Sequence, residues 1–401
     1  MLALLRQSGD VGVLDTVWAE DGTVFLRGAL WNPLLETVGR GYAGYLHLAP
    51  RLAAEVVTLF PSVHAATLLA VAAAVMAACC GGLVYLGTAG HLGDRRLRLF
   101  LGALVVLQPL MAIETLNAIA PAQWPLTFAA FWMALWRPPG WPASVLAGLV
   151  LGVTIMSAPL AFALLPILAL RVLVVRDMRS WAVVVPFLAG GALQAAAMVT
   201  QPAPNAAGGT VDELLAIWAE VVATSAVVGV DLALFLRGLA GGWLEFATVA
   251  VVASVVALAV RGRHPLTAIL ATLASLVLFT GTVWARGALE RMLAATAGGN
   301  LPDSTRFAVV PVLLLCTVLV LALDAAPPRG WSWWGGLRVA AVAAVILVAG
   351  VDYLMVNGRS WGPSWSDQIA RGVASCRVGA GEAALQVASR SGPAQRLDRR
   401  R

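Results

Sequence analysis

The sequence predicts an all-α, polytopic helical membrane protein with about ten transmembrane helices. Of its 401 residues, 60% are hydrophobic and only 12% are charged. A soluble domain carries roughly twice that share of charge, about 25%. The mean hydropathy is +0.84. Apolar runs that approach a bilayer crossing, which needs roughly 20 residues, recur along the chain between short polar loops. The chain is therefore expected to fold within a bilayer and not around one large soluble core.

The polar N-terminal segment 1–61 precedes the first apolar run. By the length criterion, we expect spans at 62–90, 98–113, 123–136, 141–157, 158–175, 180–200, 241–260, 265–283, 306–324 and 337–356. Only Ser157-Ala158-Pro159 separates the fourth from the fifth, so one buried hairpin is the alternative there. The membrane body is thus 62–356. It is followed by a tail at 357–401, whose arginine-rich end we expect to be disordered.

The placement of arginine predicts the orientation. All 27 basic residues are arginine, and most of those in short loops fall in one set of alternate loops. That set holds Arg95, Arg96, Arg98, Arg137, Arg171, Arg176, Arg179, Arg261, Arg263, Arg329 and Arg338. By the positive-inside rule these loops are cytoplasmic. Segment 1–61, the loops 201–240 and 284–305 and the tail are then extracytoplasmic in a bacterial plasma membrane.

This orientation requires a way for the N-terminal segment to cross the membrane. Met1 to Leu5 is shorter than the apolar part of a signal peptide, which has roughly 7–15 residues. We therefore expect a first transmembrane helix to precede the chain as given. The net charge of +6 reflects the loops, and with no nucleic-acid motif in the chain we expect no nucleic-acid partner.

An amphipathic helix is predicted near the end of the N-terminal segment. Tyr45, Leu48, Leu52, Val56 and Leu59 fall at helical spacing on one side. His47, Arg51, Glu55 and Thr58 fall on the opposite side. Such a helix is suited to lie in the membrane interface. His47 and Arg51 then either line a site or belong to a solvated face with i,i+4 pairing.

Two adjacent carboxylates, Glu20 and Asp21, are the first candidates for chemistry. Outside a membrane, such a pair can act as a general base or ligate a divalent metal. The alternative is a helix start, where acidic residues are favoured by the helix dipole. No other cofactor is indicated. The four cysteines show no CxxC or Cys/His spacing, which argues against a disulfide framework and a zinc site.

Arginines of the outer loops are candidates to bind phosphate. Arg286, Arg291 and Arg306 lie in or beside loop 284–305, and arginine contacts phosphate bidentately. The alternative is ordinary interfacial arginine. Glu114 and Asn117 lie in a polar loop between two spans, where an acid at a membrane edge is costly and often functional. The alternative there is a simple loop.

Several short stretches together resemble the bacterial type-C (GT-C) membrane glycosyltransferases, and more narrowly an actinobacterial group of them. These are Trp18-Ala19-Glu20-Asp21-Gly22 with Phe25, Tyr42-Ala43-Gly44-Tyr45-Leu46-His47-Leu48 with Pro50-Arg51, Asn117 with Trp124-Pro125-Leu126, Arg306-Phe307 with Pro311, and Trp365-Ser366-Asp367-Gln368. The sequence departs from the family's pattern at Phe307, where a tyrosine is expected, and at Ala122-Gln123, where an Asn-His-like pair is expected.

The resemblance implies a GT-C-like fold and an inverting transfer of a sugar from a polyprenyl-phosphate donor. The acceptor would be a glycan or lipid of the cell envelope, at the outer face. Asp21 would be the base, and Glu20 would support it or ligate a metal. Arg306, and more weakly Arg291, would stabilise the leaving phosphate.

Two other classes of function fit the composition, a lipid or polysaccharide flippase and a structural membrane subunit. A flippase is expected to place charges inside the bundle along the transport path. Here the acids cluster in the predicted outer loops, which favours chemistry at the surface. In a structural subunit, every charge pattern above would be incidental.

Overall fold

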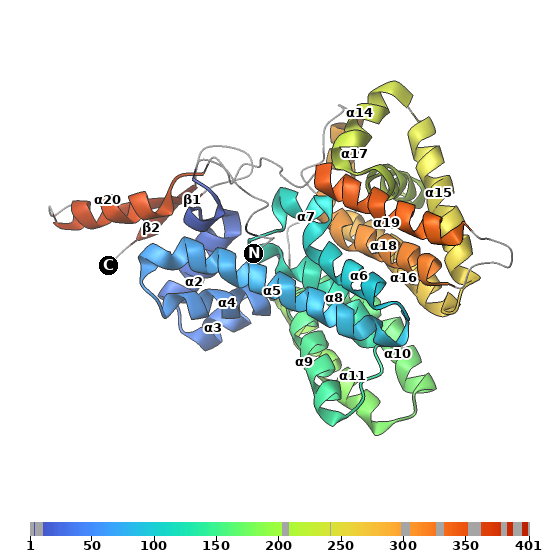
Figure 1. The fold of residues 1–401 in the computed structure, drawn as a ribbon. Coiled ribbons are helices and arrows are strands. Elements are labelled where there is room, and N and C mark those ends of the chain that lie inside the picture. Colours follow the sequence, from blue (N-terminus) through green and yellow to red (C-terminus); the bar gives the residue numbers. More distant parts are fainter. Residues whose placement is uncertain are drawn as a thin grey trace.

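The structure is a computed structural model in which nearly every described element is a helix (Figure 1). It describes Leu4 and residues 11–202, 208–240, 242–297, 305–325, 333–351, 362–377, 383–387 and 395–399. Within these residues, six helices are long and apolar enough to cross a membrane. The all-α membrane fold is thereby confirmed. The six are Ser62–Gly90, which contains α5 (Ala65–Gly87), α11 (Met178–Thr200), α15 (Trp243–Val260), α16 (Pro265–Ala285), Thr305–Asp324, which contains α18 (Val309–Asp324), and α19 (Trp334–Val351).

The remaining four expected spans are shorter helices in the structure. They are α6 (Arg95–Leu107) with α7 (Pro109–Glu114), α8 (Gln123–Leu135), α9 (Trp141–Ile155), and the 3-10 turn Pro159–Leu164 with α10 (Leu165–Val174). Pro109 cannot donate a backbone hydrogen bond, so it begins a new helix after Gln108 and divides the second expected span. The chain turns between α9 and α10, which both the two-span and the hairpin interpretation require.

A broken helix occupies part of the loop expected at 201–240. It runs through α12 (Val211–Trp218), a π-helical turn (Ala219–Ala223) and α13 (Thr224–Val228), and then bends by 118° into α14 (Val230–Ala240). A capping box at Thr210 and Glu213 starts it. Taken together, the two arms are apolar enough to form a seventh span.

Helix α18 forms the centre of the bundle. Of its most apolar stretch, 89% of the residues are buried, against 17% for α15 and 11% for α19. It packs against α6, α8, α15 and α16. A helix that is apolar on every side and enclosed by others is expected at the core of a membrane bundle. In contrast, Val249 and Val251 of α15 and Val339 and Leu347 of α19 are exposed.

Small residues bring α9 and α11 together. A Cβ atom at Gly148 would lie 2.1 Å from the carbonyl oxygen of Ala182, and one at Gly190 would lie 3.1 Å from that of Gly152. Lipid tails are as apolar as leucine, so membrane helices associate through close packing of this kind. The Gly148–Gly152 spacing is the small-xxx-small pattern that allows it.

The N-terminal residues form a separate layer beside the start of α5 (Figure 1). The layer comprises the 3-10 turn Val13–Asp15, the π-helical turn Asp21–Leu26, α2 (Arg27–Trp31), α3 (Leu34–Gly39) and α4 (Leu48–Thr58). Helix α4 is the amphipathic helix expected from the sequence. Its polar side, with His47 and Arg51, is buried, whereas Leu52, Val56 and Leu59 are exposed. On this helix the side with His47 and Arg51 therefore faces protein, and the side with Leu52 and Val56 faces outward.

The C-terminal segment returns to this layer. The side chain of Asp15 accepts a 2.8 Å hydrogen bond from the Ser366 backbone N–H at the start of α20 (Trp365–Arg377), and Trp365 Nε1 donates to the Ser62 carbonyl at 2.7 Å. Beyond α20, β1 (Ala383–Val387) pairs antiparallel with β2 (Gln395–Arg399). The rest of the end expected to be disordered lies outside the described residues.

The arginine-rich loops meet at one end of the helices. Asp324 accepts a 2.9 Å hydrogen bond from the Gly93 N–H, and Arg338 pairs with Asp94 at 2.9 Å. The rings of His91 and His264 lie 5.4 Å apart. Loops 91–94 and 263–264 and the end of α18 therefore belong to one cluster. The N-terminal layer lies at the opposite end of α5.

Candidate functional site

A strained turn presents the acidic pair. Ala19 has a φ of 34°, a conformation that costs a residue with a side chain roughly 1–2 kcal/mol. The Asp21 N–H donates to the Trp18 carbonyl at 2.9 Å and closes the turn. Asp21 then begins a π-helical turn that ends at Leu26. Rare backbone of both kinds is concentrated at functional sites.

Asp21 is fully buried and holds the loop before α8. Its two carboxylate oxygens accept hydrogen bonds from the Ile119 N–H at 3.0 Å and the Ala120 N–H at 2.8 Å. In the same loop, Asn117 is buried and has a φ of 60°. Hydrogen bonds to an ionised carboxylate are about twice as strong as neutral ones. Asp21 thereby joins the start of the π-helical turn to a loop almost a hundred residues away.

Glu20 differs from Asp21 in the hydrogen bonding of its carboxylate. Its Oε2 atom is enclosed and has no hydrogen-bond partner among the described residues. Its negative charge also contributes to raising the pKa of Tyr42. A buried carboxylate oxygen is normally hydrogen-bonded. Glu20 is therefore an available acceptor beside Tyr42.

A tight hairpin from Tyr42 to Tyr45 forms one wall of the site. The backbones of these residues exchange hydrogen bonds of 2.9 and 3.2 Å, and Ala43 and Gly44 have φ values of 51° and 87°. Two central residues with positive φ define the turn that best suits a two-residue hairpin. Distant side chains fix the hairpin: Gln201 accepts from the Gly41 N–H and Gln194 from the Leu46 N–H.

Two arginines approach this hairpin from other elements. Arg286, just after α16, donates to the Ala43 carbonyl at 3.2 Å and lies over the Tyr45 ring at 5.0 Å from its centre. Arg286 has no carboxylate partner within the described part of the chain. Arg306 lies in the 3-10 turn Thr305–Ala308 and stacks over Phe307, which in turn contacts Trp124 at 5.8 Å. The hydroxyl of Tyr45 donates to Gln123 Oε1 at 3.1 Å.

The pKa of the Tyr42 phenol is affected by all of these charged groups. Burial raises the pKa of Tyr42, and the charge of Glu20 raises it further, whereas Arg306 and Arg286 act in the opposite direction. The charges of three groups from different parts of the chain therefore act on the Tyr42 hydroxyl. Two guanidinium groups and one carboxylate leave a net positive charge. Such a site favours an anionic ligand beside a carboxylate.

His47 lies behind the hairpin as an uncharged ring. It stacks on Tyr45 with 4.0 Å between ring centres and contacts Phe25 at 5.4 Å. Its Nδ1 lies 3.1 Å from the Tyr45 carbonyl. Burial lowers the pKa of His47 to about 3, and the charges of Arg51 and Arg286 add to the effect. A histidine in this state supports the hairpin through packing and is not a proton donor at neutral pH.

The other site residues expected from the sequence are not among the groups whose charges act on Tyr42. Arg51 is buried with its guanidinium over Phe25, whose ring also contacts that of Tyr42. Arg291 is exposed on α17 (Leu289–Ala297). The side chain of Glu114 lies outside the described part of the structure. Among the described residues, no group of three His, Cys, Asp or Glu side chains could hold a metal ion.

Sequence reasoning did not assign Tyr42, Tyr45 or Gln123 to a site, and it named Arg286 only as one of three loop arginines. The Tyr-Ala-Gly-Tyr stretch carried a usable signal, because glycine beside a small residue between two aromatics favours a hairpin turn. Nothing local predicts that Gln123 and Arg286 contact this hairpin. Those contacts depend on how α8 and α16 pack.

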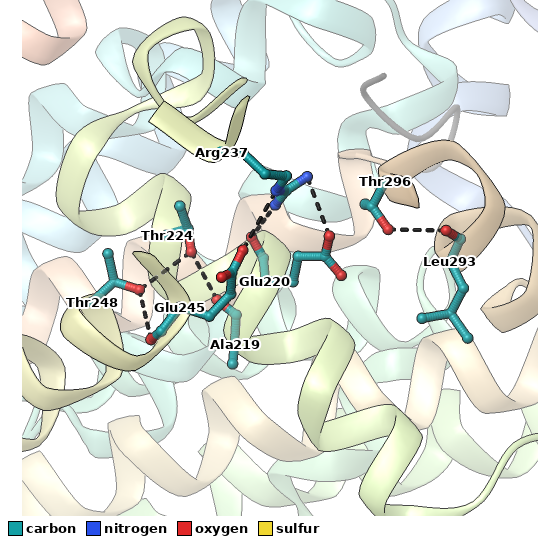
Figure 2. A network of polar contacts seen from close by, with 8 residues as sticks. All are labelled: Ala219, Glu220, Thr224, Arg237, Glu245, Thr248, Leu293 and Thr296. Carbon is teal, nitrogen blue, oxygen red and sulfur yellow. Dashed lines mark hydrogen bonds and ion pairs between the residues drawn. The ribbon is translucent and has the colours of Figure 1, made fainter. Parts of the chain in front are cut away.

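A second polar cluster ties the bent helix together (Figure 2). Arg237 of α14 pairs with Glu220 at 3.2 Å and with Glu245 of α15 at 3.4 Å. The hydroxyls of Thr224 and Thr248 lie 3.2 Å apart beside them. Partly buried ion pairs of this kind hold elements in place without contributing much net stability. We assign the cluster to fixing the 118° bend.

Comparison with known proteins gives one similarity of fold. No family model and no curated protein matches the sequence. A solved structure with a similar arrangement is the crystal structure of ArnT from Cupriavidus metallidurans in the apo state, with 15% identity and a TM-score of 0.46. The similarity covers 94% of this chain and 67% of that chain. The residues of the site therefore carry the inference of function on their own.

Proposed function

We propose that the chain is a membrane glycosyltransferase of GT-C-like fold. It would move a sugar from a polyprenyl-phosphate donor to a cell-envelope acceptor at the extracytoplasmic face of the bacterial plasma membrane. One arrangement carries the proposal: Arg286 donates to the Ala43 carbonyl of the Tyr42–Tyr45 hairpin, and the charges of Glu20, Arg286 and Arg306 all act on the Tyr42 phenol. A carboxylate that can accept a proton beside two cations that can hold a phosphate is what this transfer requires.

The proposed reaction is a single displacement. The acceptor hydroxyl gives its proton to Glu20 Oε2 while its oxygen attacks the anomeric carbon of the donor sugar. The bond between that carbon and the phosphate oxygen breaks, and its electron pair leaves with the lipid phosphate. Arg306 and Arg286 stabilise the charge that develops on that phosphate. Attack opposite the leaving group inverts the configuration of the sugar carbon.

Within the acidic pair, we assign proton transfer to Glu20 and positioning to Asp21. The resemblance to the family favoured Asp21 as the base. Both Asp21 oxygens, however, accept backbone hydrogen bonds, whereas Glu20 Oε2 accepts none among the described residues. For the same reason Glu20 is the better of the two to ligate a divalent metal, and no step above is routed through one. Arg291 remains a weaker proposal for phosphate contact, since it is exposed on α17.

The test compares three variants of the full chain in proteoliposomes with a panel of polyprenyl-phosphate sugars. We expect Glu20→Gln to lower transfer by about 10²–10⁴-fold, the usual contribution of a general base, with the thermal midpoint unchanged. Asp21→Asn is expected to lower both transfer and thermal midpoint. Glu36→Gln is the matched control, because Glu36 is exposed on α3 of the same layer, and it should behave as wild type.

Other outcomes would redirect the proposal. Full transfer by Glu20→Gln together with a stable but inactive Asp21→Asn would return the base role to Asp21. Absence of transfer by wild type across the panel would contradict the enzyme proposal. It would favour the flippase or the structural subunit, which lipid-scrambling assays in the same vesicles would distinguish.

A further inference from the structure

Arg51 is a buried cation to which the described residues supply neither a hydrogen bond nor an ion pair. Only 2% of its surface is exposed, and its Nε atom is fully enclosed. The face of Phe25 lies 5.6 Å from the guanidinium carbon. Such a cation–π contact offsets only part of the free-energy cost of removing an unpaired charge from water.

The surroundings of Arg51 differ from those of Tyr42. The charges that act on Arg51 are Arg40 and Glu55, whereas those that act on Tyr42 are Glu20, Arg286 and Arg306. The rings of Phe25 and His47 both contact the Tyr42 ring, with 6.2 and 5.6 Å between ring centres, and Arg51 lies over Phe25. Burial lowers the pKa of Arg51, the neighbouring charge of Arg40 lowers it further, and the charge of Glu55 acts in the opposite direction.

Glu55 does not neutralise this charge. It lies four residues further along α4, yet no ion pair between the two is present within 4.0 Å, and its own Oε1 is enclosed without a partner. A basic residue placed before an acidic one is also the weaker order for an i,i+4 pair. Arg51 thus keeps donors free on both terminal nitrogens.

Gly28 adjoins the guanidinium of Arg51. A Cβ atom there would lie 3.5 Å from Arg51 Nη1 and 3.8 Å from Thr37 Cγ2, which are ordinary van der Waals distances. Gly28 therefore places no side chain over this nitrogen. The surrounding surface is apolar: Leu30, Trp31, Leu34, Leu35, Leu52, Val56 and Leu59 are all exposed. An exposed apolar surface of this size marks contact with a membrane or a partner. At a membrane interface, the oxyanions within reach are lipid phosphates.

We propose that Arg51 forms an anion site in the N-terminal layer, between α2, α3 and α4, that binds a phosphate group. The guanidinium donates from Nη1 and Nη2 to two phosphate oxygens, the bidentate geometry that arginine prefers. The phosphate belongs either to a lipid headgroup or to free phosphate. The charges that act on this site differ from those that act on Tyr42, and the proposal does not depend on the proposed function.

The experiment uses the full chain, stripped of lipid in a maltoside detergent that contains no phosphate. The thermal midpoint is measured with phosphatidylglycerol, with diacylglycerol of the same chains, and with inorganic phosphate against chloride of equal ionic strength. A ligand that binds only the folded protein raises the midpoint, here by about 2 °C or more near saturation. A rise with phosphatidylglycerol but not with diacylglycerol identifies a headgroup, and a rise with inorganic phosphate identifies the free anion.

Two substitutions assign the effect to Arg51. Arg51→Gln should abolish the rise, whereas Arg27→Gln, on the exposed start of α2, should preserve it. Gly28→Asp places a carboxylate beside Arg51 Nη1. It should raise the midpoint without any ligand and remove the response to ligand. Its matched control is Gly39→Asp, where a Cβ would meet nothing within 4 Å.

A wild-type protein that responds to neither form of phosphate would overturn the proposal. So would a response that persists in Gly28→Asp, and this variant decides the question even if Arg51→Gln fails to fold.

Discussion

Among single residues, burial determines what the titratable groups of the N-terminal layer can do, and His47 makes this measurable. Its pKa is about 3 in the folded chain and about 6.5 when unfolded. Between these values only the unfolded chain binds the proton, so folding stability is lost as the pH falls below about 6.5. Each pH unit in that window changes the free energy of unfolding by about 1.4 kcal/mol.

We therefore expect acidification from pH 7 to 4.5 to remove about 2–3 kcal/mol of stability through His47 alone. His47→Phe keeps a stacking ring and removes the titration. It should be less sensitive to acid than wild type by that amount in denaturant unfolding. His64→Asn, at an exposed histidine, should leave the pH dependence unchanged. Equal acid sensitivity in wild type and His47→Phe would show that His47 is not buried as an uncharged ring.

The acidic pair shows how much of the site the sequence predicts at the level of single residues. The sequence identified Glu20 and Asp21 as the group to examine, because carboxylates are rare in this chain. It could not divide their roles. Those depend on a positive φ at Ala19, on a π-helical turn and on backbone donors of loop 117–120. Spacing along the chain contains none of these.

Among elements, the pairing of α9 with α11 carries the most specific prediction. Gly148→Ala would place a Cβ 2.1 Å from the Ala182 carbonyl oxygen. Backbone cannot yield there as a flexible side chain would, so the helices must separate. Overpacking of this kind costs about 1–3 kcal/mol. We expect a clear fall in the midpoint of Gly148→Ala in a detergent-based thermal assay.

Gly281 supplies the control for this prediction. It lies within α16, and a Cβ at that position would meet nothing within 4 Å. Gly281→Ala should leave stability unchanged or raise it by up to about 1 kcal/mol, because alanine favours helix. Equal effects of the two substitutions would mean that α9 and α11 do not approach as described.

The sequence predicted most elements because hydropathy and periodicity are local properties. All ten apolar segments are helical, although four are shorter than a full crossing. Helix α4 shows the limit. The spacing separated Leu52 and Val56 from Arg51, but Tyr45, expected on the apolar side, lies before the helix and is buried. Only the structure shows that the side with His47 and Arg51 is buried and the side with Leu52 and Val56 exposed. Which face meets protein depends on the neighbours, and no pattern within one helix encodes them.

In the whole molecule, the two ends of the bundle differ in chemistry. One end joins the arginine-rich loops through contacts of Asp324, Arg338 and His91. The other carries the N-terminal layer, the Tyr42–Tyr45 hairpin and the sites proposed at Glu20 and Arg51. Loops rich in arginine remain in the cytoplasm. The arrangement therefore predicts that both proposed sites face outward, where lipid-linked sugar donors and cell-envelope acceptors would meet.

Labelling with a membrane-impermeant maleimide checks this orientation. Single cysteines are introduced as Arg40→Cys, exposed at the end of α3, and Arg96→Cys, exposed at the start of α6, with the four native cysteines replaced by serine. In intact cells we expect rapid labelling at position 40 and labelling at position 96 only after the cells are permeabilised. The reverse pattern would place the reaction centre on the cytoplasmic side. That result would rule out a transferase that uses extracytoplasmic donors. It would not change the contacts around Tyr42, and a substrate would then have to reach them from the cytoplasm.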